Sequence, residues 1–155
     1  YAQAVNTLAS LGIINGVGGG KFDPDREISR AEFVAIATRF AKAADEVSNP
    51  FVDVDENAWY ASYVTTAVSY GWITGVGGNR FAPEDLMTRA EAVTIVNRML
   101  ARNADREFID GNAVQQFSDV APGVWYYYQI MEAANNHSHR YNEDGYEVWN
   151  GLVNN

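Results

Sequence analysis

The feature that most constrains this chain is a long internal repeat. Residues 12–32, GIINGVGGGKFDPDREISRAE, return without a gap as residues 71–91, GWITGVGGNRFAPEDLMTRAE. A repeat of this kind indicates copies of one supersecondary unit, and because each copy cannot bury its apolar face alone, we expect the copies to share a core. A third copy is partial: residues 51–54 (FVDV) recur as residues 117–120 (FSDV), but the match fades after Ala134.

The repeat defines the expected organisation. We predict a single domain over residues 1–155, with repeat 1 at residues 1–42, repeat 2 at residues 51–102 and a repeat 3 at residues 117–155 that is either partial or degenerate. Tyr1 aligns with Tyr60, so the segments expected before the first copy are absent, and we expect the sequence to be a piece of a longer protein. The apolar content of 47% is enough for a shared core.

Charge and composition exclude several classes of function. The net charge is −9, with 20 acidic and 11 basic side chains, which is the wrong sign for general binding to nucleic acid or to an anionic membrane. We therefore expect any anion to be captured locally. The chain has no cysteine, which excludes disulfides and thiolate metal sites. It also shows no apolar run long enough for a membrane span, and its first residues do not have the pattern of a basic segment followed by an apolar one.

Two capping boxes predict the start of a helix in each complete copy. Ser29 with Glu32, and Thr88 with Glu91, have the spacing in which a hydroxyl and a carboxylate satisfy free N–H groups at a helix start. Apolar residues follow each box at helical spacing. We therefore assign both glutamates to the caps rather than to a ligand.

The segments around these helices complete each unit. Residues 1–10 and 60–70 are predicted to be helices that end through a glycine at Gly12 and Gly71. Each unit is then a helix, a glycine-rich loop and a helix, and several loop glycines are expected to have positive φ. Polar linkers are predicted at residues 43–50 and 103–116. In the tail, an Asp-Gly pair within residues 141–146 indicates a turn and a short hairpin.

Taken together, the Phe-x-Asp-Val start, the Gly-Ile-Ile-Asn-Gly middle and the Ser/Thr-Arg-Ala-Glu box resemble the S-layer homology module, over roughly residues 1–135. The resemblance implies an all-α fold, with tandem helix–loop–helix repeats in a pseudo-threefold arrangement around a central helical bundle. It implies noncovalent, noncatalytic anchoring of a surface protein to secondary cell wall polysaccharide, often pyruvylated. It also implies that the ligand grooves lie between neighbouring repeats.

Two arginines are candidates for holding an anion. Arg30 and Arg89 directly follow the caps, where the helix dipole disfavours a cation. A guanidinium beside free N–H groups and a glycine loop can bind a carboxylate through a bidentate interaction. The structural alternative is that each arginine pairs with a carboxylate such as Asp53 or Asp119, or with a helix C-terminus. As exposed residues at a helix start, both are expected to contribute little to stability.

Aromatic and acidic residues of the repeat add further candidates. Trp59 and Trp125 could stack on sugar rings, but their place in the repeated framework favours core packing. Trp72 replaces an isoleucine beside the loop and is the better groove candidate. Asp53 and Asp119 are expected to cap helices, although a sugar hydroxyl could use them. The predicted polysaccharide-binding residues are Arg30, Arg89, Gly16, Val17, Gly75, Val76, Trp72, Asp53 and Asp119.

Other motifs carry less information. Residues 16–21 lack the spacing of a phosphate-binding loop, and residues 23–27 lack that of an EF-hand. His137 and His139 flank one serine, and two histidines without a third ligand favour surface residues over a metal site. No catalytic set is tied together by spacing. We therefore expect no enzyme, no cofactor and no metal.

The sequence thus predicts an extracellular module at the bacterial cell wall that binds polysaccharide. The alternative is a scaffold or self-association module of a surface layer, whose grooves receive another polypeptide.

Overall fold

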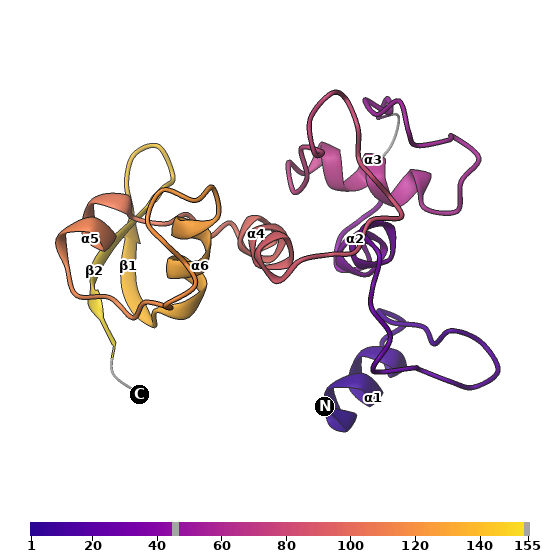
Figure 1. Cartoon of the computed structure of the whole chain (residues 1–155), viewed down its shortest axis with the longest axis horizontal. Coiled ribbons are helices and arrows are strands. Elements are labelled where there is room, and N and C mark those ends of the chain that lie inside the picture. The colour runs from indigo at the N-terminus through magenta and orange to yellow at the C-terminus, as the bar shows by residue number, and fades with distance from the viewer. Residues whose placement is uncertain (45–46, 154–155) are drawn as a thin grey trace. The chain divides into compact units, whose positions relative to one another are not determined.

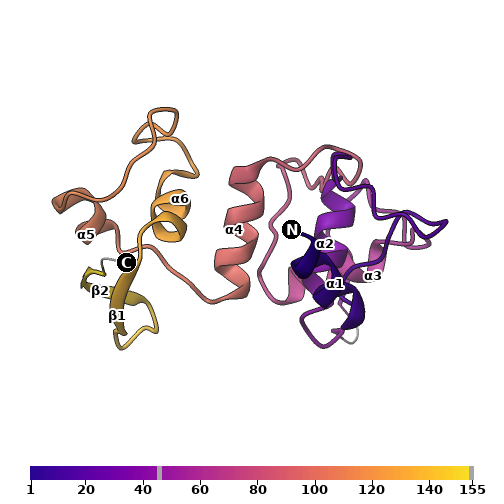
Figure 2. The ribbon, with the colours of Figure 1, turned by 90° about the horizontal axis from the view of Figure 1, so that it is seen from below.

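The computed structural model describes residues 1–44 and 47–153, which form two compact units, Tyr1–Met87 and Thr88–Asn155. Figures 1 and 2 show the elements of both units. The division falls inside repeat 2, between its glycine loop and its second helix. No helix in the described part of the chain combines the length and apolar character needed to cross a bilayer.

The first unit contains α1 (Ala2–Ser10), α2 (Arg30–Thr38) and α3 (Ala61–Ser69). The predicted glycine ends of α1 and α3 are confirmed. Gly12 and Gly71 have φ of 71° and 70°, and the residue after each glycine donates its N–H to a carbonyl five positions back. This is the Schellman arrangement, in which glycine adopts a left-handed conformation without a steric penalty from Cβ.

The capping boxes also form as predicted, one at the start of α2 and one at the start of α4 (Arg89–Met99). In each, the hydroxyl accepts an N–H bond and the glutamate accepts one in return. Helix α2 of repeat 1 packs against α3 of repeat 2, so these two copies share a core as expected. The buried apolar residues of this unit include Ala31, Val34, Ala35, Val54, Val64, Ala67, Ile73 and Phe81.

The two segments that lead into the capping boxes of repeats 1 and 2 lie side by side. The Arg30 N–H donates to the Asp85 carbonyl at 2.9 Å, and the Met87 N–H donates to the Ile28 carbonyl at 3.1 Å. These bonds fix the loop of repeat 2 against the start of α2.

The second unit contains α4, α5 (Arg106–Gly111), α6 (Tyr127–Ala134) and an antiparallel hairpin of β1 (His137–Tyr141) and β2 (Glu147–Leu152). Figure 1 shows the hairpin beside α6. A small core of Ile109, Val114, Tyr127, Met131 and Trp149 holds these elements together.

The all-α prediction is wrong, because repeat 3 does not complete a helix–loop–helix unit. Where repeats 1 and 2 have a glycine loop and a capping box, the chain after α6 forms the hairpin. The turn predicted at residues 141–146 is confirmed, with Gly145 at φ 80°. Residues 103–116 were expected to be linker, but they contain α5, whose N-cap residue Asp105 accepts the Phe108 N–H at 3.0 Å.

Candidate functional site

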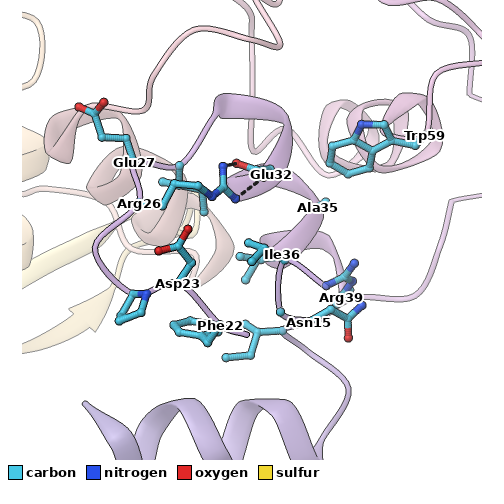
Figure 3. Close-up of a pocket in the computed structure, with 15 residues that line it drawn as sticks. Asn15, Phe22, Asp23, Arg26, Glu27, Glu32, Ala35, Ile36, Arg39 and Trp59 are labelled. Atoms are coloured by element: carbon cyan, nitrogen blue, oxygen red, sulfur yellow. Dashed lines mark hydrogen bonds and ion pairs between the residues drawn. The ribbon is translucent and has the colours of Figure 1, made fainter. Parts of the chain in front are cut away.

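An open groove of about 600 Å³ lies along repeat 1 (Figure 3). One side is the glycine loop and the segment that follows it, and another is the partly buried face of α2 that carries Glu32, Ala35 and Ile36. Trp59, which belongs to repeat 2, also lines the groove. The residues that line it are Ile14, Asn15, Gly16, Val17, Phe22, Asp23, Pro24, Arg26, Glu27, Ile28, Glu32, Ala35, Ile36, Arg39 and Trp59.

The groove combines apolar walls with polar edges. Trp59 is 58% exposed, so much of its ring surface faces solvent. In Figure 3 its indole lies on one side of Ala35 and Ile36, and Arg26 and Glu32 lie on the other. The indole also contacts Tyr60 and Tyr63 edge-on, with ring centroids 5.4 and 6.5 Å apart. These contacts hold the ring in place without covering it.

Arg26 and Glu32 form an ion pair at one end of the groove. The Arg26 Nη2 lies 2.7 Å from Glu32 Oε1, and the second oxygen of Glu32 accepts the Ser29 N–H at 3.0 Å. The hydrogen bond from Arg26 holds the pKa of Glu32 below its usual value, against the effect of partial burial. Glu32 therefore serves the helix cap and also fixes Arg26.

Arg39 provides a second guanidinium. One of its terminal nitrogens donates to the Ile13 carbonyl at 2.9 Å, and its guanidinium carbon lies 5.6 Å from the centre of the Tyr63 ring. In residues 1–44 and 47–153, no carboxylate forms an ion pair with it. Its remaining N–H donors could bind a carboxylate or a hydroxyl of a ligand in the groove.

In repeat 2 the phenylalanine of the equivalent loop is covered rather than exposed. Phe81 is fully buried, and the Phe51 ring lies 5.6 Å from it, centroid to centroid. The Asp53 carboxylate accepts the N–H groups of Phe81 and Ala82 at 2.8 and 2.9 Å. The equivalent Phe22 of repeat 1 is 39% exposed and lines the groove. The Phe-x-Asp-Val segment of repeat 2, residues 51–54, thus covers the phenylalanine of the repeat 2 loop.

Asp53 does not cap a helix, so that expectation is wrong. The N-cap residue of α3 is Tyr60, and no side chain caps it. Partial burial of Asp53 raises its pKa, but the two backbone N–H donors and the Arg80 guanidinium, 3.4 Å away, outweigh this and lower the pKa overall. Asp119, at the matching place in repeat 3, is exposed and does not cap α6.

The two predicted arginines have different surroundings. Arg30 is only 6% exposed, and its Nε–H donates to the Phe81 carbonyl at 2.9 Å. Its guanidinium also lies 5.2 Å from the centre of the Phe81 ring. The expectation that Arg30 is exposed is therefore wrong, and the reason for expecting a small contribution to stability no longer applies to it. Arg89 is exposed at the start of α4, as expected.

The tryptophan assignments are reversed. Trp59 and Trp125 were expected in the core, but they are 58% and 65% exposed. Trp72, the preferred groove candidate, is 8% exposed and stacks on Tyr70 at 5.0 Å between ring centroids. It does not line the groove of repeat 1.

The predicted loop residues have different surroundings in repeats 1 and 2. Gly16 and Val17 line the groove of repeat 1, and Val17 is 49% exposed. A Cβ on Gly16 would collide with the Lys21 carbonyl oxygen. Gly75 has φ 78°, and a Cβ there would meet the Arg80 carbonyl oxygen and the Phe51 ring at 2.5 and 2.6 Å. Val76 is 51% exposed.

Sequence reasoning missed Arg26 and Arg39 as groove residues. A signal was available for Arg39, because Arg98 stands at the same place in repeat 2. Arg26 has no such signal, since its counterpart is Asp85.

Comparison with known proteins identifies the repeats. The S-layer homology domain family matches residues 1–34 and 50–93. A cellulosome-anchoring protein of Acetivibrio thermocellus is 32% identical over 153 residues, which cover 95% of this chain and 33% of that protein. A surface-layer 125 kDa protein of Lysinibacillus sphaericus is 33% identical over 119 residues, covering 75% of this chain and 10% of that protein. The predicted family and the predicted location at the bacterial surface are both confirmed.

Enzymes are also found among the relatives. An amylopullulanase of Thermoanaerobacterium thermosulfurigenes is 36% identical over 97 residues, which cover 62% of this chain but 5% of the enzyme. The chain thus spans a third or less of the length of these three relatives. Such partial coverage is typical of a module that accompanies different partner domains.

Proposed function

Because the chain belongs to the S-layer homology domain family, we propose that it anchors a bacterial surface protein to the cell wall by holding polysaccharide in the groove of repeat 1. The observation that carries this proposal is the exposed Trp59 ring beside an apolar stretch of α2, with guanidinium groups at the edges. Sugar rings present flat C–H faces that pack on an indole, while their hydroxyls need donors and acceptors nearby.

The polar residues of the groove fit such a ligand. Arg39 and Arg26 supply donors, while Asp23 and Glu27 supply acceptors. The lining has three carboxylates against two guanidinium groups, so its charge does not attract anions in general. A pyruvylated sugar would therefore be held by one guanidinium, and we assign this contact to Arg39 because no carboxylate in the described residues neutralises it.

The proposal redistributes the roles of the predicted residues. Gly16 and Val17 remain groove residues, since they line it. Arg30 and Asp53 are assigned to the structure, because their side chains bond to the backbone of the repeat 2 loop. Arg89 remains a second candidate contact, exposed and separate from this groove. The module itself is proposed to be noncatalytic.

A pull-down with purified cell walls tests the proposal. The chain should sediment with intact walls and stay in solution with walls from which the secondary polymer has been removed chemically. Arg39→Gln should weaken binding to walls that carry pyruvylated polymer, and Arg106→Gln, on a helix of the second unit, should not. Equal sedimentation with intact and stripped walls would refute the polysaccharide assignment.

One observation favours the alternative of a polypeptide ligand. Phe81 in repeat 2 is covered by Phe51, whereas the equivalent Phe22 is half-buried in an open groove. A segment with a similar aromatic residue from another chain could cover Phe22 in the same manner. Sedimentation velocity over a range of concentrations decides: self-association that Phe22→Ala abolishes, without polysaccharide binding, would support this alternative.

A further inference from the structure

The hairpin that replaces the last part of repeat 3 brings together two histidines and two glutamates. His137 and His139 lie on β1, Glu147 lies on β2 and Glu132 lies on α6. Glu132 and Glu147 are 2% and 3% exposed, and the His137 side chain is fully buried. Charged groups are rarely buried to this extent unless they are paired or bind a metal.

The positive charge in this cluster does not balance the negative charge. Arg102 lies 2.7 Å from Glu132 Oε1 and 3.0 Å from Glu147 Oε1, so one guanidinium serves two carboxylates. The Glu147 Oε2 atom faces away from these contacts, toward the histidines. One further positive charge, or a proton on Glu132, whose pKa is raised by burial, would neutralise the site.

The hydrogen bonding of His137 directs a lone pair into the cluster. Its Nδ1 lies 2.7 Å from the Asn135 carbonyl oxygen, and only a protonated Nδ1 can donate to that acceptor. In the neutral ring Nε2 is then an acceptor, and it lies 3.2 Å from Glu147 Oε2. Two acceptors face each other at this distance, which favours a cation at this point; the Arg102 Nη2 lies 3.0 Å from Nε2, and a metal ion would take its place there. A backbone carbonyl that fixes the other ring nitrogen is also a common feature of metal-binding histidines.

A third donor atom completes the set. The His139 Nδ1 lies 3.6 Å from the same Glu147 oxygen, and the three donor atoms all lie within 4.8 Å of one another. Ligands about 2.1 Å from a tetrahedral zinc ion are about 3.4 Å apart, so the separations of 3.2 and 3.6 Å from Glu147 need only small adjustments, while the two histidine nitrogens, which lie within 4.8 Å of each other, would have to draw closer. His139 is partly exposed, which leaves a path for the ion and room for a water ligand.

We propose that His137, His139 and Glu147 bind a divalent transition-metal ion of the zinc type, with Arg102 and Glu132 as neighbours. Two imidazoles and one carboxylate suit zinc and exclude the oxygen-only sites of calcium and magnesium. In the structure the Arg102 Nη2 lies 3.0 Å from His137 Nε2. When the ion binds, Arg102 would keep its contacts with Glu132 Oε1 and Glu147 Oε1 and move away from His137 Nε2. The ion links both strands of a two-stranded hairpin, an element that is marginally stable by itself. This site is separate from the proposed polysaccharide groove and does not depend on it.

Isothermal titration of the chelator-treated chain with Zn²⁺ tests the proposal. We expect one ion per chain, a higher midpoint of thermal unfolding with Zn²⁺, and the absorption of tetrahedral Co²⁺ when cobalt replaces zinc. His139→Gln, which changes a partly exposed ligand, should weaken Zn²⁺ binding by more than about 100-fold, beyond the loss typical of changing a residue that only orients a ligand. The same variant should unfold like the parent in the presence of chelator.

Glu143→Gln is the matched control, because Glu143 is an exposed acidic residue of the hairpin turn. It should bind Zn²⁺ like the parent. No stoichiometric Zn²⁺ binding, or undiminished binding by folded His139→Gln, would overturn the proposal. His137→Gln is less decisive, because the His137 ring also stacks on Trp149 at 3.6 Å between centroids.

Discussion

Asp53→Asn should destabilise the first unit, because the Asp53 carboxylate closes the loop of repeat 2. Its two oxygens accept the N–H groups of Phe81 and Ala82, both of which belong to buried residues. An asparagine side chain has one acceptor oxygen, so one buried N–H loses its partner and the other loses a charged acceptor. Leaving one buried donor unsatisfied costs about 1–3 kcal/mol, and with the weakened second bond we expect a total of about 2–4 kcal/mol.

The pH dependence provides a second readout of the same interaction. The pKa of Asp53 is lowered in the folded chain, so its contribution is complete above its pKa in the unfolded chain, about 3.9. That contribution is lost as the pH falls through the lower, folded pKa. Asp53→Asn should therefore reduce the dependence of stability on pH in this acidic range.

Asp119→Asn is the control, since Asp119 occupies the same place in the Phe-x-Asp-Val motif of repeat 3 but is exposed. Its free energy of unfolding should change by less than about 0.5 kcal/mol. Urea unfolding gives the stabilities, and hydrogen exchange at the amides of Phe81 and Ala82 locates the effect. Unchanged exchange at both amides in Asp53→Asn would refute the assigned role.

Three further predictions concern the glycine loop and the helix starts. Gly75→Ala should lower the free energy of unfolding in urea by more than about 2 kcal/mol, because the backbone at Gly75 is left-handed and a new Cβ would collide with its neighbours. Gly111→Ala is the control and should not lower stability, because Gly111 has no positive φ and open space around its Cα. Arg30→Ala should lower the free energy of unfolding by about 1–3 kcal/mol, because it removes a buried hydrogen bond to a carbonyl. Arg89→Ala, at an exposed position, should change it by less than about 0.5 kcal/mol. Similar values for the two variants would contradict the assigned difference in burial. Thr88→Ala should lower stability by about 1 kcal/mol through loss of the cap, and helicity measured by circular dichroism should fall with it.

The features that sequence predicted correctly depend on neighbouring residues. The capping boxes and the glycine helix ends need contacts only within a few positions, so the repeat was enough to place them. The turn at residues 141–146 is equally local. The all-α prediction is wrong for the segment after α6, where repeat 3 lacks the glycine loop and the capping box of the other copies and forms a hairpin instead.

The features that sequence missed depend on distant partners. The buried Arg30 side chain donates a hydrogen bond to a carbonyl 51 positions away in the sequence, and no pattern near Arg30 indicates this bond. Trp59 was assigned to the core from its place in the framework, but the structure leaves its ring in an open groove. The sequence favours surface positions for His137 and His139, but the hairpin buries His137 and brings Glu147 close to both rings, where we propose a metal site.

The central claim, that the groove of repeat 1 binds cell wall polysaccharide, is tested most directly by titrating purified polymer into the chain and into Trp59→Ala. Trp59 is largely exposed, so the variant should remain folded, and Tyr146→Ala, an exposed aromatic in the hairpin turn, is the control. We predict that Trp59→Ala weakens binding at least about tenfold, equivalent to about 1.4 kcal/mol, and that Tyr146→Ala binds like the parent. Polymer binding that is equal in the parent and in folded Trp59→Ala would contradict the account.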